Sequence, residues 1–392
     1  MSTSPANYHP TVIVIGGGAT GAGIARDASQ RGFKVIVIEM GEMASGTTGH
    51  FHGILHSGSR YAVQDLATAA ECYNENQILR RMIPSAITDT GGLFLAMNDE
   101  EASYADTLIE ACIGAGIPAE EISIDEVRAG EPHVGPSLKR AFTVPDAFID
   151  GVHMVKLNQA AAEHAEVPAK FLTNHQVVGV GKTGDSVSSV RVRDTQSGEI
   201  HDISCDYVIN ASGIWAGLIA GLADIKLEMI YDKGSMIAYQ DNFSTAVLNR
   251  CRPQDDGDLL VPSGGFSVLG TTARVITDID QGWPTQEEID VLIREGSEMI
   301  PALQAAEVSK IYAGIRPLQG SPALQPTENT RGISRSYHVI DHAHDGVNNF
   351  ISVVGGKVTV YRLMAETAVD LLCSKTGNSA TCQTANTTLH NT

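Results

Sequence analysis

The hydrophobic pattern near the N-terminus predicts two buried strands on either side of a helix. Residues 11–15 form a short, continuous apolar run rich in β-branched side chains, which is typical of a strand covered on both faces in a parallel sheet. Residues 22–30 are predicted as a helix that ends at 31–33, and residues 34–38 as a second buried strand. This order of strand, helix and strand indicates one βαβ unit.

Strands and helices that do not continue this unit follow further along the chain. A long helix is predicted over 67–82, and a strand of a different sheet over 91–96. Alternating residues over 187–210 predict a hairpin-like stretch that ends in an apolar strand. A last strand, 350–354, leads into a helix over 360–372. The first unit is therefore interrupted by inserted segments.

The domain organisation follows from three junctions at which a strand runs through a glycine turn into a helix. They lie near residues 16, 211 and 355, and two β-rich insertions separate them. This spacing predicts an α/β protein with α+β insertions, in which a Rossmann-like domain of discontinuous segments binds a nucleotide and a β-rich domain caps it. The predicted segments are 1–80, 151–225 and 336–392 for the nucleotide-binding domain, and 81–150 and 226–335 for the substrate-binding cap. The tail from Ser374, rich in Thr, Asn and Ser, is expected to be loosely ordered.

The first junction carries a glycine pattern that suits a dinucleotide. Gly16, Gly18 and Gly21 form G-x-G-x-x-G, which allows a tight turn and lets backbone amides approach a pyrophosphate at the helix N-terminus. Glu39 ends the second predicted strand, where a carboxylate accepts hydrogen bonds from ribose hydroxyls and disfavours a 2′-phosphate. A glycine-rich turn without a ligand would leave Glu39 unexplained. The loop 41–49, rich in glycine and hydroxyl side chains, is predicted to wrap a second phosphate.

Length, charge and cysteine spacing narrow the function further. The 392 residues suffice for two domains, and 43% of them are hydrophobic, as in globular proteins. Lys plus Arg total 27 against 46 Asp plus Glu, a formal charge of -19, which excludes a general nucleic-acid binder and opposes contact with an anionic membrane. The six cysteines form no C-x-x-C pair, so neither an iron–sulfur nor a zinc site is expected. Without a signal peptide or an apolar run of about 18 residues, the protein is expected to be cytoplasmic and not membrane-spanning.

Motifs along the whole chain resemble one family of flavoproteins. The motifs are IGGGATGAGIAR from Ile15, HGILHSGSRYAV from His52, ENQILRR from Glu75, VINASGIWA from Val208, DKGSMIAY from Asp232, LGTT from Leu269, YAGIRPL from Tyr312 and GGKVTVYRLMAE from Gly355. Their order and spacing, over about residues 11–385, are similar to those of FAD-dependent glycerol-3-phosphate dehydrogenases, and to the A-subunit type of the anaerobic enzyme rather than the aerobic membrane enzyme.

The resemblance implies FAD rather than NAD as the cofactor and a fold like that of D-amino-acid oxidase. The ADP half of an extended flavin would lie on the first βαβ unit, with the substrate between the flavin and the sheet of the cap. The implied reaction oxidises sn-glycerol 3-phosphate to dihydroxyacetone phosphate by hydride transfer from C2 to the flavin. The cofactor-binding residues expected on this basis are Gly16, Gly18, Gly21, Glu39, Thr47, Thr48, Gly49, Val177, Ala211, Gly213, Gly355, Gly356, Lys357 and Val358.

His56 is the expected catalytic base, since histidine suits the removal of a hydroxyl proton near neutral pH. The resemblance places it close to the flavin ring, and Arg60 and Tyr61 follow it to position a substrate phosphate. The alternative is a histidine that only hydrogen-bonds the cofactor. A metal site at His50, His52 and His56 is not expected, because the glycines oppose a helix there and no acid or cysteine completes the ligands.

Three further cations are expected at the active site, and two of them, Arg316 and Lys357, are expected to be catalytic together with His56. The resemblance places Arg316 and Arg335 at the phosphate, whose oxygens match the planar guanidinium; the alternative is a pair of surface ion pairs. Lys357, at the start of a helix, is expected to stabilise the reduced flavin, and the alternative is a solvated lysine.

The sequence departs from the family at two points. The A subunit of the anaerobic enzyme typically continues into a cysteine-bearing iron–sulfur domain that these 392 residues do not include, so the electron route stays open. The aerobic enzymes carry a histidine where this chain has Met236, and no base role is carried over there. An external acceptor is expected, through partner subunits that would hold the protein peripherally at the inner face of the membrane; a homodimer is possible.

Two alternative functions remain open. One is a related flavoprotein that oxidises a 2-hydroxy acid, in which Arg316 and Arg335 would clamp a carboxylate. The other is an electron-transfer or regulatory flavoprotein without turnover of a small substrate, since fold alone does not define function.

Overall fold

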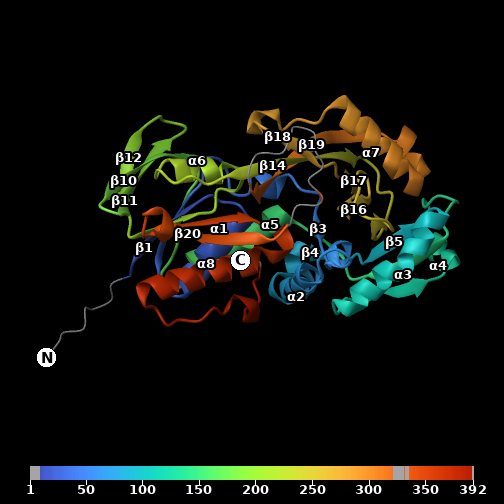
Figure 1. Cartoon of the computed structure of the whole chain (residues 1–392), viewed down its shortest axis with the longest axis horizontal. Helices are drawn as coiled ribbons and strands as arrows, with labels where there is room; N and C mark the ends of the chain where they lie inside the picture. Colours follow the sequence, from blue (N-terminus) through green and yellow to red (C-terminus); the bar gives the residue numbers. More distant parts are fainter. Residues whose placement is uncertain (1–8, 321–330, 332–334, 391–392) are drawn as a thin grey trace.

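The computed structural model describes residues 9–320, 331 and 335–390, and a six-stranded sheet organises one side of it (Figure 1). Its order is β20-β21-β13-β1-β2-β9, and all neighbours run parallel except β20 and β21. The predicted strands at 11–15 and 34–38 are two of its inner members. The six strands are β1 (Thr11–Ile15), β2 (Lys34–Ile38), β9 (Lys170–Leu172), β13 (Tyr207–Asn210), β20 (Tyr337–Asp341) and β21 (Phe350–Gly355).

A nine-stranded sheet organises the other side. Its order is β18-β14-β17-β16-β15-β5-β7-β6, and β19 pairs with β14. The strand predicted over 91–96 belongs to it. The nine strands are β5 (Gly92–Ala96), β6 (Glu120–Ile122), β7 (Arg140–Val144), β14 (Met229–Tyr239), β15 (Val247–Arg250), β16 (Leu259–Ser263), β17 (Phe266–Gly270), β18 (Arg274–Ile276) and β19 (Val308–Gln319).

Each large sheet draws its strands from the segments predicted for one domain. The six-stranded sheet uses strands within 1–80, 151–225 and 336–392, and the nine-stranded sheet uses strands within 81–150 and 226–335. The domain boundaries themselves stay a prediction.

Two small sheets complete the strands. One contains β10 (His175–Thr183), β11 (Ser186–Asp194) and β12 (Ile200–Ser204), and the other contains β3 (Ile54–Leu55), β4 (Ile87–Thr88) and β8 (Ala147–Ile149). The predicted hairpin over 187–210 is therefore only partly correct. Its second strand ends at Ser204, and Asp206 accepts a hydrogen bond from the Thr11 amide as the chain turns into the parallel sheet.

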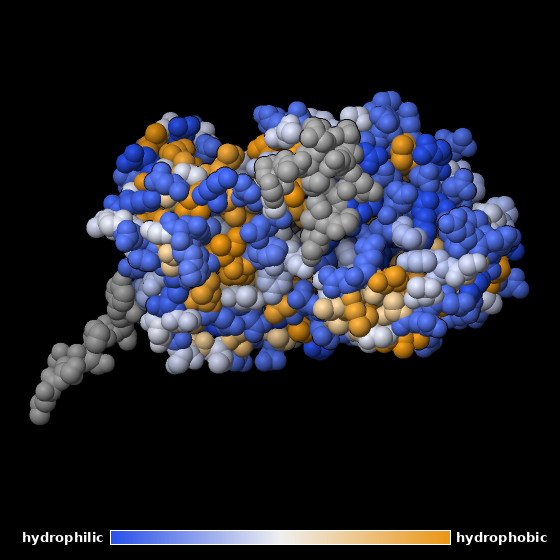
Figure 2. All heavy atoms as spheres, viewed as in Figure 1, coloured by the Kyte–Doolittle hydropathy of each residue, from blue (hydrophilic) through white to orange (hydrophobic). Residues whose placement is uncertain are grey.

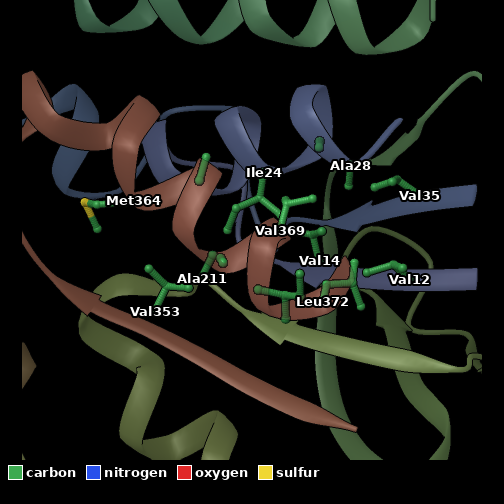
Figure 3. Close-up of a cluster of buried hydrophobic side chains, with 14 of the residues drawn as sticks. Val12, Val14, Ile24, Ala28, Val35, Ala211, Val353, Met364, Val369 and Leu372 are labelled. Carbon is green, nitrogen blue, oxygen red and sulfur yellow. The ribbon is translucent and has the colours of Figure 1, made fainter. Parts of the chain in front are cut away.

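Helices cover one face of the six-stranded sheet. Side chains of α1 and α8 meet those of β1 and β2 in one buried cluster, part of which Figure 3 shows. The opposite face packs against α6 and the small sheet β10-β11-β12. The helices are α1 (Ala19–Gln30), α2 (Leu66–Met82), α3 (Asp99–Gly114), α4 (Ile124–Gly130), α5 (Gly151–Glu163), α6 (Ala216–Gly221), α7 (Gln286–Met299) and α8 (Tyr361–Thr376).

The C-terminal tail is anchored, contrary to the expectation of a loosely ordered segment. The guanidinium of Arg26, which is buried, donates hydrogen bonds to the carbonyl oxygens of Thr384 and Thr387. The Leu389 amide donates to the Met82 carbonyl oxygen, and the Leu389 side chain is buried. The polar composition of the tail hid these contacts, because the partners lie in helices far away in the sequence.

Polar residues cover most of the face shown in Figure 2, with apolar side chains scattered between them. Within the described ranges, no helix has the length and apolar character that a membrane span requires.

Candidate functional site

A cleft of about 450 Å³ lies along the glycine turn that follows β1. Gly16 has φ +111°, and a Cβ atom there would lie 2.5 Å from the Ala211 carbonyl oxygen. A Cβ on Gly21 would lie 1.9 Å from the Gly16 carbonyl oxygen. Only glycine fits at both positions, so the backbone of the turn closes tightly and leaves the cleft open at the N-terminus of α1.

Glu39 lies at the end of β2 and lines the cleft. One carboxylate oxygen accepts a hydrogen bond from the Gly17 amide at 2.6 Å, and the other accepts from the Gly41 amide at 2.9 Å. The carboxylate therefore holds the glycine turn and the next loop together, in addition to the ribose contact that the sequence predicts.

Of the three cofactor-binding residues predicted in the loop after Glu39, which are Thr47, Thr48 and Gly49, the first two reach the cleft. Thr48 is buried and accepts a hydrogen bond from the Ala19 amide at 3.0 Å, while Thr47 donates to the Ile315 carbonyl oxygen at 2.9 Å. Both residues line the cleft. Gly49 is exposed and lies outside that lining, as does Gly21, which acts through the turn instead.

The second and third junctions form the remaining walls. Gly355 has φ +80°, and a Cβ there would lie 2.6 Å from the Ser336 carbonyl oxygen, so this turn also requires glycine. The predicted residues that line the cleft are Gly16, Gly18, Glu39, Thr47, Thr48, Val177, Ala211, Gly213, Gly355, Gly356, Lys357 and Val358.

Sequence reasoning missed an apolar edge of the cleft. Trp215, Leu218 and Leu222 line it, and Leu218 is 60% exposed. Leu222 is also exposed, at 36%, and such neighbouring apolar side chains at the edge of a cleft are typical of a surface that a ligand covers. The signal in the sequence was weak, because apolar residues in and beside a short helix (α6) are typical of ordinary core.

His52 and His56 lie side by side outside the lining of the cleft, near the end at which Lys357 lies. The rings of His52 and His56 are 5.9 Å apart, and the ring of Tyr61 lies 5.7 Å from that of His56. The backbone of His56 is fixed on both sides, since its amide donates to Thr359 Oγ1 at 3.1 Å and its carbonyl oxygen accepts from Asn76 at 3.1 Å. The ring is thus presented at a defined place.

Both histidines are neutral at physiological pH. Burial lowers the pKa of His56 well below its usual value, and His52, Arg60 and Lys357 lower it further. Burial, with Arg316 and Arg60, lowers the pKa of His52 to about 3. A neutral imidazole can accept a proton, which is what the predicted base requires.

Arg60, Tyr61 and Lys357 surround this histidine pair. Arg60 pairs with Asp258 at 3.2 Å. The Lys357 ammonium lies 4.6 Å from the centre of the Tyr61 ring and donates a hydrogen bond to the Arg335 carbonyl oxygen at 3.3 Å. Lys357 is therefore not simply solvated at the start of its helix.

Arg316 and Arg335 meet on one carboxylate. Arg316 Nη1 lies 2.9 Å and Arg335 Nη1 2.6 Å from Asp232 Oδ2, and Asp232 is fully buried. These are not the surface ion pairs of the alternative interpretation. Sequence reasoning missed Asp232 as a functional residue, although it opens the motif DKGSMIAY.

The cysteines are dispersed. All six are free, and five of them are buried. Among the described residues, no group of three or more His, Cys, Asp or Glu side chains is arranged to hold a metal ion.

Comparison with known proteins places this chain in a family. The model of the family described as "FAD dependent oxidoreductase" matches residues 11–362, and the chain belongs to this family. The predicted FAD-dependent oxidoreductase and the predicted fold class are confirmed.

Relatives within the family are more specific. The chain is 43% identical over 382 residues to the A subunit of anaerobic glycerol-3-phosphate dehydrogenase from Escherichia coli K12, covering 96% of this chain and 69% of the relative. It is 40% identical to the A1 subunit of the same enzyme from Haloferax volcanii, covering 96% of this chain and 65% of the relative. The predicted resemblance to the A-subunit type of the anaerobic enzyme is confirmed.

Solved structures share the fold at lower identity. Glycerol-3-phosphate dehydrogenase from Bacillus halodurans, complexed with FAD, matches with a TM-score of 0.72 and 21% identity over 97% of this chain and 68% of that one. L-α-Glycerophosphate oxidase from Mycoplasma pneumoniae, with FAD bound, matches with a TM-score of 0.70 and 18% identity over 98% of this chain and 97% of that one.

Proposed function

We propose that the chain oxidises sn-glycerol 3-phosphate to dihydroxyacetone phosphate. The observation that carries this proposal is the convergence of a neutral His56 with the cations Arg60, Arg316 and Lys357, whose charges act on the histidine pair. The names of the relatives support the same substrate. A neutral base next to several cations is what a dianionic alcohol requires.

The residues of the cleft fit FAD. The glycine turn at Gly16 leaves no room for a side chain, the carboxylate of Glu39 lies at the end of β2, and Leu218 offers an apolar surface at the edge. When bound, FAD supplies the acceptor for the hydride that leaves C2 of the substrate.

In the proposed reaction, His56 acts as the base, and the neighbouring cations bind the substrate and stabilise negative charge. His56 takes the proton of the C2 hydroxyl as the hydride leaves, so that the carbon–oxygen single bond becomes the carbonyl of dihydroxyacetone phosphate. Arg60, Arg316 and Arg335 bind the phosphate and fix the alcohol against the base. The ammonium of Lys357 would stabilise the negative charge of the reduced flavin.

Anaerobic reduction of the bound flavin by a panel of alcohols tests the proposal. Glycerol 3-phosphate should bleach the flavin, while glycerol and glycerate should do so only at far higher concentration, because they lack the dianionic phosphate. Bleaching by glycerate instead would support the 2-hydroxy acid alternative. Bleaching by none of them would support a flavoprotein without turnover of a small substrate.

Arg316→Ala should remove the preference for glycerol 3-phosphate over glycerol in kcat/KM. Arg191→Ala is a matched control, since Arg191 pairs with Asp202 at 2.9 Å on the small sheet and is well exposed. An unchanged preference in Arg316→Ala would exclude this arginine as a phosphate ligand.

We further infer that the electrons pass to partner subunits and that such subunits hold the protein at a membrane. The relatives are named as subunits of a larger enzyme, and the net charge of -19 opposes direct contact with anionic lipid. Turnover with a dye acceptor should be fast and turnover with oxygen slow. Rapid, stoichiometric peroxide production would show a self-sufficient oxidase.

A further inference from the structure

Asp232 joins the two arginines of the proposed phosphate site. Strands β14 and β19 are antiparallel, and their register places Asp232 directly opposite Arg316. One oxygen of the Asp232 carboxylate contacts both Arg316 and Arg335, at 2.9 and 2.6 Å. Asp232 has no exposed surface, whereas 28% of the Arg316 side chain is exposed. The carboxylate thus lies behind the arginines, on the side away from solvent.

The position of Arg316 does not depend on Asp232 alone. Its guanidinium also donates to Thr271 Oγ1 and to the Thr272 carbonyl oxygen. Thr272 is itself fixed, because its hydroxyl donates to Glu288 at 3.1 Å and accepts from the Ser235 amide at 3.0 Å. Several neutral groups can therefore keep the guanidinium in place when the Asp232 charge is removed.

The main effect of Asp232 is on charge. Arg316 and Arg335 together carry two positive charges, and the shared carboxylate leaves a net charge of about one. Neighbouring arginines follow the same pattern, since Asp258 contacts Arg60 and Arg252 while Asp256 contacts Arg274 and Arg331. Because Asp232 is buried, solvent screens its charge less than it would at the surface.

We propose that Asp232 determines the charge selectivity of the site, and that it limits the preference for dianionic over monoanionic substrates. The proposal rests on the proposed function only in that Arg316 and Arg335 receive the anionic group. Coulomb energy scales with the product of the charges, so the Asp232 carboxylate repels a dianion about twice as strongly as a monoanion. Removal of the Asp232 charge should therefore increase the affinity for a dianion more than the affinity for a monoanion.

Binding of two unreactive anions to the FAD-loaded protein tests this without turnover. The probes are sulfate, a dianion, and formate, a monoanion, measured by calorimetry or by the change in flavin absorbance. Asp232→Asn should raise the ratio of the formate Kd to the sulfate Kd by about tenfold. Asp232→Ser, a second neutral variant, should raise it in the same direction and serves if Asp232→Asn does not fold.

Two control variants are available. One retains the negative charge at position 232, and the other removes a negative charge from a distant surface ion pair. Asp232→Glu should leave the ratio near its original value, even if both affinities fall. Asp202→Asn removes the same charge from an exposed pair with Arg191 and should change neither Kd.

Equal changes in both Kd values, or a lower ratio, would overturn the proposal and leave Asp232 as a support for the arginines. Failure of the proposed function would be seen separately, as the absence of flavin reduction by glycerol 3-phosphate in the unmodified protein.

Discussion

Replacement of Glu39 tests how the glycine turn and cofactor affinity are linked. The two carboxylate oxygens accept hydrogen bonds from the Gly17 and Gly41 amides, at 2.6 and 2.9 Å. These bonds hold the turn in shape before any ribose reaches it. Because the same carboxylate is also predicted to contact the ribose, we expect replacement of Glu39 to lower both FAD affinity and stability.

The magnitude follows from the number of bonds. A hydrogen bond to a charged group contributes about 1.5–3 kcal/mol. Glu39→Gln keeps one carbonyl oxygen but places an NH₂ group against an amide donor, so it loses one of the two bonds, and Glu39→Ala loses both. We expect the free energy of unfolding to fall by about 2 kcal/mol for Gln and about 4 kcal/mol for Ala. Without the ribose acceptor, the FAD Kd should rise roughly tenfold to a hundredfold.

Urea unfolding of the FAD-free protein and titration with FAD, followed by flavin fluorescence, measure the two effects separately. Glu42→Gln is the matched control, since this neighbouring carboxylate is exposed and accepts from Asn174 at 2.9 Å. Unchanged FAD affinity in Glu39→Ala would refute the ribose contact. Unchanged stability would show that the two amides do not depend on the carboxylate.

Two further predictions concern the histidine pair. His56→Asn should slow flavin reduction in stopped-flow by about a hundredfold or more while substrate binding changes little, because a base acts in the transition state; an unaltered rate would place the base elsewhere. The low pKa of His52, about 3, means that the unfolded state binds more protons below about pH 6.5. Stability should therefore be lost as the pH falls through this range, by about 2 kcal/mol from His52 at about pH 5. Thermal unfolding at neutral pH and at about pH 5 should show a smaller loss of stability in His52→Asn than in the unmodified protein. An equal loss in the two proteins would mean that His52 is readily protonated in the folded protein.

The parts of the fold that could be predicted were those with local causes. The strands at Thr11–Ile15 and Lys34–Ile38 are continuous apolar runs because both faces are buried, and their bounds were correct. The glycine turn at Gly16 was recognisable because its residue type is required by a positive φ and a close backbone contact.

The parts that could not be predicted depend on contacts between distant residues. The hairpin was extended too far because alternation continues past Ser204, and only the pairing of β13 with β1 shows that the chain changes sheet. The tail was expected to be loose because its polar composition does not reveal the buried Arg26 that holds it, 358 residues away from Thr384. Asp232 and Arg316 are 84 residues apart and meet only through strand register.

A protein with a formal charge of -19 can bind an anionic substrate because the charges close to the site, and not the net charge, determine binding. At physiological ionic strength, charges more than about 8 Å apart in solvent are largely screened, so the acidic remainder of the surface acts weakly on a bound anion. The side chains around the histidine pair act at shorter range and from partly buried positions, where screening is less. Among the described residues there, Arg60, Arg316 and Arg335 contact two aspartates, Asp258 and Asp232, and Lys357 adds a further positive charge. The bound anion therefore responds to the balance of these few side chains, and a single buried carboxylate such as Asp232 changes that balance more than the net charge of the chain does.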